Sequence, residues 1–338
     1  MNAATRHFAL PLTDSDRAAL RRIAVQRGKS PSVSDDQLLR IWRGDDGVAP
    51  VLEFPHEQLE RIRSEAVESA TAAAVTAIQQ HRTVHVVVEQ AGREPVDCGV
   101  QHVRFPILLK ACGARTPDGN RLNIWLRGPA GSGKTTAAKV AAQTLGLPFV
   151  FNGAISTPFE LLGFIDANGK PVRTPFREAW EHGGVYLFDE VDSSNPNAVT
   201  AFNAALANGV CAFPDGLVQR HPDCIVIAGA NTSGNGATSE YVGRLKQDAA
   251  FLNRFVEIHW CLDEALERAL CPHPTWVARV QTIRRRVEER GIKGHLITPR
   301  ATLYGSALLD TGLDQDTVEQ LVLRKGLADD VWDQIKHD

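Results

Sequence analysis

Short apolar runs alternate with helix-forming stretches between about residues 106 and 261. The runs are NIWLRG (123–128), PFVFNG (148–153), GVYLFDE (184–190), DCIVIAGANT (223–232) and FVEIHW (255–260). Each is almost continuously apolar, which is typical of parallel strands that are covered by helices on both faces. The pattern therefore predicts an α/β core over 106–261, in which a five-stranded parallel sheet is flanked by helices.

The flanking segments have different patterns. Residues 1–82 are predicted to be a helical extension, with one helix in TDSDRAALRRIAVQRG and a second within 55–82, where alanine is frequent and glycine and proline are absent from EAVESATAAAVTAIQQ. Residues 83–105 contain two short strand-like runs around a glycine turn, which predicts a β-hairpin or linker. After residue 262 the pattern is wholly helical, so 262–338 is predicted to be a small C-terminal lid.

Composition narrows the classes of function. The net charge of -3 is close to neutral, so no strong overall field draws the chain to nucleic acid or to acidic membranes, although a local basic stripe remains compatible with it. The six cysteines form no CxxC pair and have no metal-ligand spacing, as expected of buried thiols in a reducing cytosol. Neither a secretory signal nor a membrane span is apparent, so we expect a cytoplasmic protein.

The first core strand leads into GPAGSGKTT, which has the spacing of a phosphate-binding loop. Its glycines leave the backbone N–H groups free to converge on phosphate oxygens, and the following helix directs its positive end to the same place. Lys134 is expected to neutralise charge on the β- and γ-phosphates, and the Thr135 hydroxyl to ligate Mg²⁺. The sequence thus predicts a nucleoside triphosphate site formed by Gly128, Pro129, Ala130, Gly131, Ser132, Gly133, Lys134, Thr135 and Thr136.

Two acids follow the third core strand, in VYLFDEVDSSNP. The carboxyl edge of a parallel sheet is where its ligands bind, so both acids should lie beside the phosphate loop. We expect Asp189 to orient Mg²⁺ through water, and Glu190 to act as the base that polarises the attacking water. Asp192, two residues further on, is interpreted as a helix cap or a surface charge.

With these motifs in place, residues 100–310 resemble the AAA+ ATPases, and the chain is identified as similar to their MoxR and dynein-related branch. The resemblance implies ATP as the nucleotide and gives roles to three further side chains. Asn231, after CIVIAGA, matches the sensor-1 residue that holds the attacking water or the γ-phosphate. Arg254, in FLNRF, matches the arginine that reaches the nucleotide of the adjacent subunit, with an intrachain salt bridge as the alternative. Arg300, in HLITPRATL, matches the sensor-2 arginine, which acts in cis or in trans.

The branch is indicated by two inserted segments. FELLGFIDANGKPVRTPFREAW (159–180) has an Asn-Gly turn and resembles the helix-2 insertion, and LANGVCAFPDGLVQRHPDCI (206–225) resembles the pre-sensor hairpin. The GPL motif that is frequent in MoxR proteins is replaced by TPFREAW. Phe164 and Ile165 are expected near the tip of the insertion, where they would offer apolar surface to a polypeptide. The alternative is that Phe159 and Phe164 pack the insertion onto its own domain. Arg244, in EYVGRLKQ, is either a second arginine acting in trans or a structural residue.

The resemblance implies a ring-forming ATPase, with a hexamer expected, that remodels a protein partner. Under this interpretation the chain is similar to the CbbQ and NorQ activators and to the small-subunit ATPase of cobaltochelatase. Such proteins often act with a separate partner that carries a von Willebrand A domain. The alternatives are a nucleic-acid motor, as in phage or restriction-type DNA processing, and a scaffold that binds ATP in order to assemble. Glu190 argues against the scaffold, and the acids at 288 and 289 after the arginines at 284–286 favour a solvated lid helix over a basic stripe.

Overall fold

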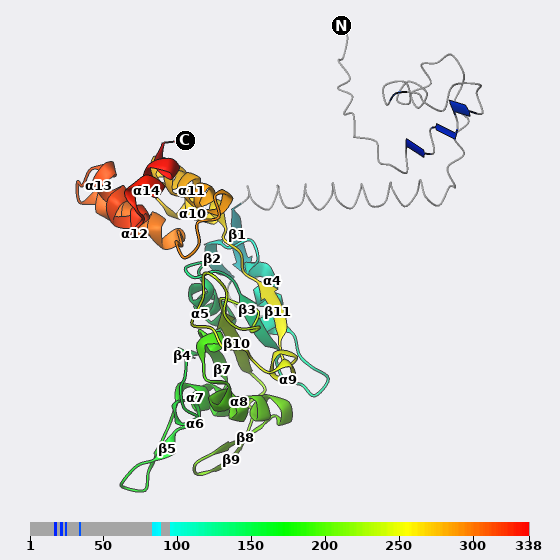
Figure 1. Cartoon of the computed structure of the whole chain (residues 1–338). Helices are drawn as coiled ribbons and strands as arrows, with labels where there is room; N and C mark the ends of the chain where they lie inside the picture. The colour runs from blue at the N-terminus through cyan, green and yellow to red at the C-terminus, as the bar shows by residue number, and fades with distance from the viewer. Residues whose placement is uncertain are drawn as a thin grey trace. The chain divides into compact units, whose positions relative to one another are not determined.

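A five-stranded parallel sheet is the centre of the fold in the computed structural model, in the order β11-β3-β10-β7-β4 (Figure 1). Its strands are β3 (Asn123–Arg127), β4 (Phe149–Asn152), β7 (Gly184–Phe188), β10 (Cys224–Ala230) and β11 (Val256–His259). All neighbouring pairs are parallel, and each strand lies within one of the predicted apolar runs. The predicted α/β fold class is therefore confirmed.

The structure describes residues 83–88 and 95–337, together with positions 17, 18, 21, 22, 24, 25 and 34. The chain divides into two units, Met1–Ala74 and Val75–Asp338, and the sheet belongs to the second. In the predicted helical extension, positions 17, 18, 21, 22, 24 and 25 are helical. The helix predicted within 55–82 lies outside the described residues.

Successive residues of the central strands face opposite helical layers, which explains why these strands are apolar throughout. In β7, Val185 and Leu187 pack with α4 (Phe105–Gly113) and α5 (Lys134–Leu145). Tyr186 and Phe188 face the other layer. That layer is formed by α7 (Pro175–His182) and α8 (Pro196–Asn208), which contribute Phe176, Trp180 and Phe202 to an aromatic cluster.

Three antiparallel hairpins are added to this core. The first pairs β1 (Val84–Val88) with β2 (Val96–Gln101). The second follows the short helix α6 (Phe159–Leu162) and pairs β5 (Phe164–Ile165) with β6 (Pro171–Val172), with the predicted Asn-Gly turn between them. The third pairs β8 (Val210–Phe213) with β9 (Gly216–Gln219) around Pro-Asp-Gly. The hairpins expected in both inserted segments are therefore present, and both project from the end of the core that lies away from the C-terminal helices (Figure 1).

The segment after residue 262 is helical, as its pattern predicts. Trp276, Ile283, Leu323 and Trp332 are fully or almost fully buried in a hydrophobic cluster of its own. Within the described part of the chain, none of the helices is both long enough and apolar enough to span a bilayer. The helices are α10 (Glu264–Leu270), α11 (Pro274–Glu289), α12 (Pro299–Asp310), α13 (Gln315–Glu319), the π-helix Gln320–Arg324 and α14 (Asp329–Lys336).

Candidate active site

The loop between β3 and α5 has the backbone geometry of a phosphate cradle. Gly131 and Gly133 have φ angles of 74° and 87°, a region that glycine enters without a steric penalty. Gly128 is equally constrained, because a Cβ there would lie 1.8 Å from the carbonyl oxygen of Trp260. Helix α5 begins at Lys134, so its unpaired N–H groups and its positive end face the loop.

Lys134 is held at the centre of this loop by three oxygen acceptors. Its Nζ donates to the carbonyls of Gly128 at 2.7 Å and Pro129 at 3.0 Å, and to Oδ1 of Asn231 at 2.8 Å. Burial lowers the pKa of the Lys134 ammonium to about 8, while the carboxylates of Asp189 and Asp192 oppose that shift. The structure thus brings the predicted Asn231 to the predicted phosphate loop, from the end of β10.

Asp189 and Thr135 form a pair of oxygen ligands beside the loop. Thr135 Oγ1 donates to Asp189 Oδ2 at 2.7 Å, and the backbone N–H of Asp189 donates to Asn152 at the end of β4. Carboxylate and hydroxyl oxygens are what Mg²⁺ prefers, and it commonly takes few protein ligands together with phosphate oxygens and water. The described residues contain no cluster of three or more His, Cys, Asp or Glu side chains suited to a metal, so these two residues would hold Mg²⁺ only with phosphate and water ligands.

Glu190 directs its side chain out of the strand edge. Its backbone is left-handed, with φ 53°, and its N–H donates to Asp189 Oδ1 at 3.0 Å. A non-glycine residue in this region is uncommon and is often found where function requires it. The carboxylate is 55% exposed and lies 3.7 Å from Arg244 Nη1, so water has access to it.

Asp192 is fully buried, and its interpretation as a helix cap or a surface charge is therefore wrong. Its Oδ2 accepts hydrogen bonds from the backbone N–H groups of Asn231 and Thr232 and from the Thr232 hydroxyl, at 3.1, 2.9 and 2.9 Å. Arg244 Nε lies 3.5 Å from the same oxygen. The acid fixes the end of β10, and with it Asn231, to the segment that carries Glu190.

Arg300 lies beside the phosphate loop of its own chain. Thr298 caps helix α12, and a Cβ added to Gly131 would meet Thr298 Oγ1 at 2.8 Å and Arg300 Cγ at 3.4 Å. The Arg300 charge is also near enough to lower the pKa of Lys134, although burial is the larger cause. Of the two directions left open by the resemblance, the fold thus offers the cis contact.

Arg254 is exposed at the start of β11, at the amino edge of the sheet, and is not brought to the phosphate loop of its own chain. Asn123 Nδ2 donates to its backbone carbonyl at 3.1 Å. In the described part of the chain no carboxylate pairs with its guanidinium, so the alternative of an intrachain salt bridge is not realised there.

Two aromatic residues that the sequence analysis did not single out also support the loop. Trp260 Nε1 donates to the Ser132 carbonyl at 3.0 Å, and His102 stacks on the indole with ring centroids 4.0 Å apart. The hydroxyl of Tyr241 accepts from the Ala130 N–H at 3.0 Å, and Arg244 lies over the Tyr241 ring. Only the position of Trp260 at the end of an apolar run could have indicated its role.

The part of the chain that carries the phosphate loop, Asp189 and Glu190 is similar to known proteins. Residues 124–251 match the ATPase family associated with various cellular activities (AAA). Over 146 residues the chain is 32% identical to Protein SAV of Sulfolobus acidocaldarius, covering 42% of this chain and 17% of that protein. An uncharacterized protein of Staphylococcus saprophyticus is 31% identical over 152 residues, covering 40% of this chain and 54% of its own length. The chain thus spans about half or less of the length of these relatives.

Solved structures with similar arrangements include NtrX from Brucella abortus in complex with ATP and a RuvB mutant from Thermotoga maritima. NtrX is 17% identical with a TM-score of 0.39, covering 86% of this chain and 65% of that chain. RuvB is 16% identical with a TM-score of 0.42, covering 64% of this chain and 67% of that chain.

Proposed function

We propose that the chain is an AAA+ ATPase that hydrolyses ATP with Glu190 as the base, since residues 124–251 match the AAA ATPase family. One observation carries the proposal. The cradle of residues 128–136, the ammonium of Lys134, the amide of Asn231 and the acids Asp189 and Glu190 meet at the carboxyl edge of one parallel sheet. This is where ligands of such sheets bind.

Each group has a distinct task in this mechanism. The backbone N–H groups and Lys134 hold the phosphates and offset their charge, and Arg300 adds a second cation from the lid. Thr135 and Asp189 would hold Mg²⁺, which neutralises charge between the phosphates when it is bound. Glu190, exposed to water at the strand end, takes the proton of the attacking water, while Asn231 orients it.

The direct test separates binding from turnover. Glu190→Gln keeps the cradle and removes the base, so ATP should bind with unchanged affinity while turnover falls about 100-fold or more. Steady-state phosphate release and equilibrium ATP binding measure the two quantities. Glu288→Gln, which changes an exposed acid on α11, is the matched control. Turnover of Glu190→Gln at the unsubstituted rate would show that another group is the base.

We further propose that the protein assembles into a homo-oligomeric ring, with six subunits as expected for this type of ATPase. The supporting observation is Arg254, which is exposed at the amino edge of the sheet, opposite the edge that carries the cradle, and has no acidic partner among the described residues. In a ring this side chain can reach the nucleotide of the next subunit and stabilise charge in the transition state.

For the biological role we propose remodelling of a protein partner, as in MoxR-like ATPases, and a separate protein with a von Willebrand A domain as a further partner. Support comes from Phe159, Phe164 and Leu217, which are 64%, 47% and 76% exposed on the two inserted segments, Phe159 on α6 and the other two on the hairpins. Because Phe159 and Phe164 are exposed, they do not pack the insertion onto its own domain. An apolar groove of ≈ 370 Å³ lies between α8 and the β8–β9 hairpin, and Leu162 lines it from α6. Exposed apolar side chains next to an apolar groove form a surface on which a polypeptide can bind.

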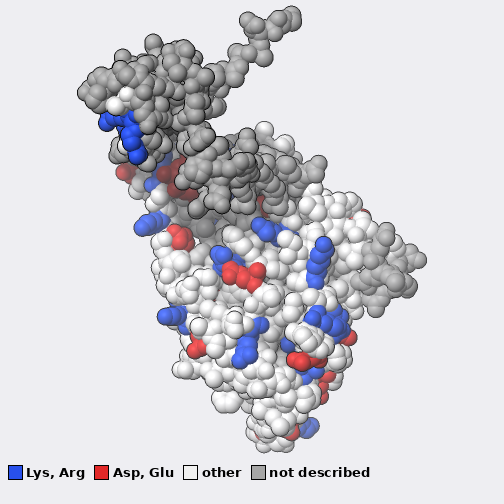
Figure 2. All heavy atoms as spheres, turned by 90° about the vertical axis from the view of Figure 1, so that its right-hand side faces the viewer, with Lys and Arg blue, Asp and Glu red and all other residues white. Residues whose placement is uncertain are grey.

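The electrostatic pattern gives less support to the nucleic-acid motor. On the face seen in Figure 2, basic and acidic side chains are interspersed. Two of the three arginines at 284–286 on α11 are engaged within the lid: Arg284 pairs with Glu267 at 2.7 Å, and Arg286 donates to the Ile335 carbonyl, whereas Arg285 is exposed. The described cysteines are all free thiols, which agrees with a location in the reducing cytoplasm.

The role is tested by trapping. The Glu190→Gln protein, loaded with ATP and Mg²⁺, is incubated with native extract with and without nuclease, in parallel with a Glu190→Gln, Phe164→Ser variant. A bound polypeptide that survives nuclease and is lost with Phe164→Ser is the expected result. Retention of nucleic acid, or of proteins that nuclease releases, would favour the motor instead.

A further inference from the structure

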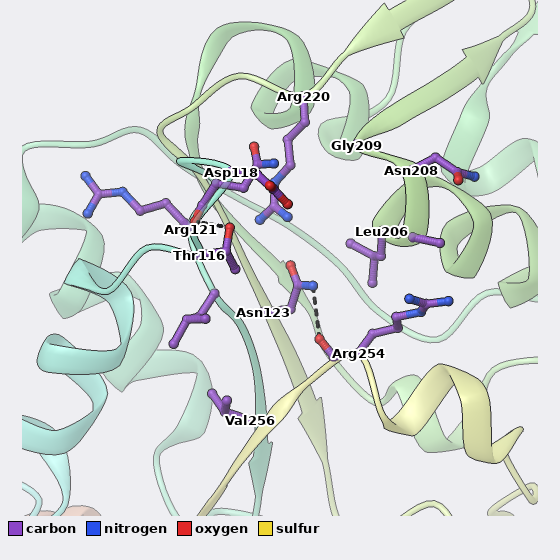
Figure 3. A pocket seen from close by; sticks show the side chains of 13 residues that line it. Thr116, Asp118, Arg121, Asn123, Leu206, Asn208, Gly209, Arg220, Arg254 and Val256 are labelled. Atoms are coloured by element: carbon purple, nitrogen blue, oxygen red, sulfur yellow. Dashed lines mark hydrogen bonds between the residues drawn. The ribbon is translucent and has the colours of Figure 1, made fainter.

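A pocket distinct from the ATP site and from the apolar groove lies at the amino edge of the sheet, opposite the edge that carries the phosphate loop. It has a volume of ≈ 340 Å³ and opens between the amino ends of β3 and β11, the C-terminus of α8 and the base of the β8–β9 hairpin (Figure 3). Three of its lining residues are arginines, Arg121, Arg220 and Arg254, against one acid, Asp118. The pocket therefore has an excess of positive charge.

Arg220 is the most informative of the three. It is only 9% exposed, and its guanidinium is directed into the pocket (Figure 3). Nη2 donates to the Cys224 carbonyl at 2.9 Å and the group lies over the Trp180 ring, but Nε has no partner. Among the described residues no carboxylate is within ion-pair distance of Arg220. A buried cation without an anion is costly, so a ligand anion would relieve it.

The other two arginines differ in how far they are already engaged. Arg121 is already paired: it donates to Asp223 Oδ1 at 2.9 Å, an oxygen that Arg115 also contacts at 2.7 Å, and to the Gly113 carbonyl. Arg254 is not paired with any described acid, and its backbone is held by Asn123, whose Oδ1 is buried without a partner (Figure 3). The pocket thus combines two guanidinium groups, those of Arg220 and Arg254, that no described carboxylate neutralises.

From this combination we propose that the pocket binds a small phosphate-class oxyanion, separate from the ATP site. Guanidinium groups match the oxygens of phosphate with paired, charge-assisted hydrogen bonds, and they bind it more strongly than a neutral group does. The volume admits inorganic phosphate or a compact phosphorylated molecule.

The site has a consequence that rests on the proposed function. Arg254 cannot contact an anion in this pocket and the nucleotide of a neighbouring subunit at the same time. Occupancy of the pocket should therefore lower the rate of ATP hydrolysis in the assembled protein without competing with ATP. Binding itself does not depend on hydrolysis, so it is measured separately.

The test uses inorganic phosphate and the full chain with Lys134→Ala, which weakens phosphate binding at the ATP site. Calorimetric titration should give about one phosphate per chain. Adding Arg254→Gln or Arg220→Gln should weaken binding about tenfold, whereas Arg285→Gln, at an exposed arginine on α11, should not. If Arg220→Gln fails to fold because of its contact with Trp180, the exposed Arg254 keeps the test decisive.

Two outcomes would overturn the proposal. One is the absence of saturable phosphate binding at millimolar concentrations in the Lys134→Ala chain. The other is binding with the same affinity in the Arg254→Gln and Arg285→Gln chains, which would place the phosphate elsewhere. If binding is confirmed but phosphate leaves hydrolysis unchanged, the pocket stands and the coupling through Arg254 is rejected.

Discussion

At the scale of single residues, the cradle is defined by the environment of Lys134. Its ammonium is buried and bound to two carbonyls and to the amide oxygen of Asn231, so in this structure Asn231 serves the lysine. The resemblance assigns Asn231 to the attacking water or the γ-phosphate. Both descriptions are compatible if phosphate oxygens replace the amide as the partner of Lys134, which would release Asn231 for that task.

The lowered pKa of Lys134, about 8, predicts the pH dependence of ATP binding. Below pH 8 the ammonium is charged in the free protein and attracts phosphate. Above pH 8 it must first take up a proton, so affinity should fall, by up to about tenfold per pH unit. Equilibrium binding between about pH 7 and 9.5 measures this, and Lys134→Arg, whose guanidinium stays charged, should not show the fall. A constant affinity of the unsubstituted chain across that range would contradict the prediction.

At the scale of elements, β7 and β10 are fixed to each other beyond their ladder by Asp192. Its carboxylate accepts from Asn231, Thr232 and the Thr232 hydroxyl, and the N–H of Leu245 donates to its backbone carbonyl at 2.8 Å. Arg244 adds a cation to the same group. The relative position of Asn231 and Glu190 therefore depends on one buried acid.

We expect Asp192→Ala to lower the free energy of unfolding by about 2–4 kcal/mol, because several buried donors and the Arg244 cation lose their acceptor. Turnover of ATP should fall with it, since Asn231 is no longer held. Urea denaturation and phosphate release measure the two effects. Asp333→Ala, at an exposed acid on α14, is the control. A loss below about 0.5 kcal/mol would show that the buried network is not structurally important.

Local features explain how much of this could be predicted from the sequence. The strands, the phosphate loop and both turn-containing hairpins depend on neighbouring residues, and each was predicted at the correct positions. The burial of Asp192 and the contact between Trp260 and Ser132 depend on segments that meet only in the folded chain. Hydrophobic pattern and motif spacing do not show which distant segments meet. They therefore predict neither contact, although the apolar run that ends at Trp260 places this residue at a strand end.

At the scale of the whole molecule, the two edges of the sheet hold different parts of the proposed catalytic machinery. The carboxyl edge holds the cradle, Asp189 and Glu190, whereas the amino edge exposes Arg254 beside the arginine-lined pocket. A single subunit would then have a base, a cradle and the cis cation Arg300, but its own Arg254 would not reach its own nucleotide. In the proposed ring, hydrolysis is therefore completed by the Arg254 of an adjacent subunit.

Mixing two inactive variants tests whether Arg254 acts on the nucleotide of an adjacent subunit. Arg254→Ala should bind ATP normally and turn over slowly, and Lys134→Ala should bind ATP poorly. In a random equimolar mixture, roughly a quarter of the interfaces combine an intact cradle with an intact arginine, so phosphate release should recover to a comparable fraction of the unsubstituted rate. Contradiction would be a mixture no more active than the average of the two variants, at concentrations where sedimentation confirms mixed assemblies.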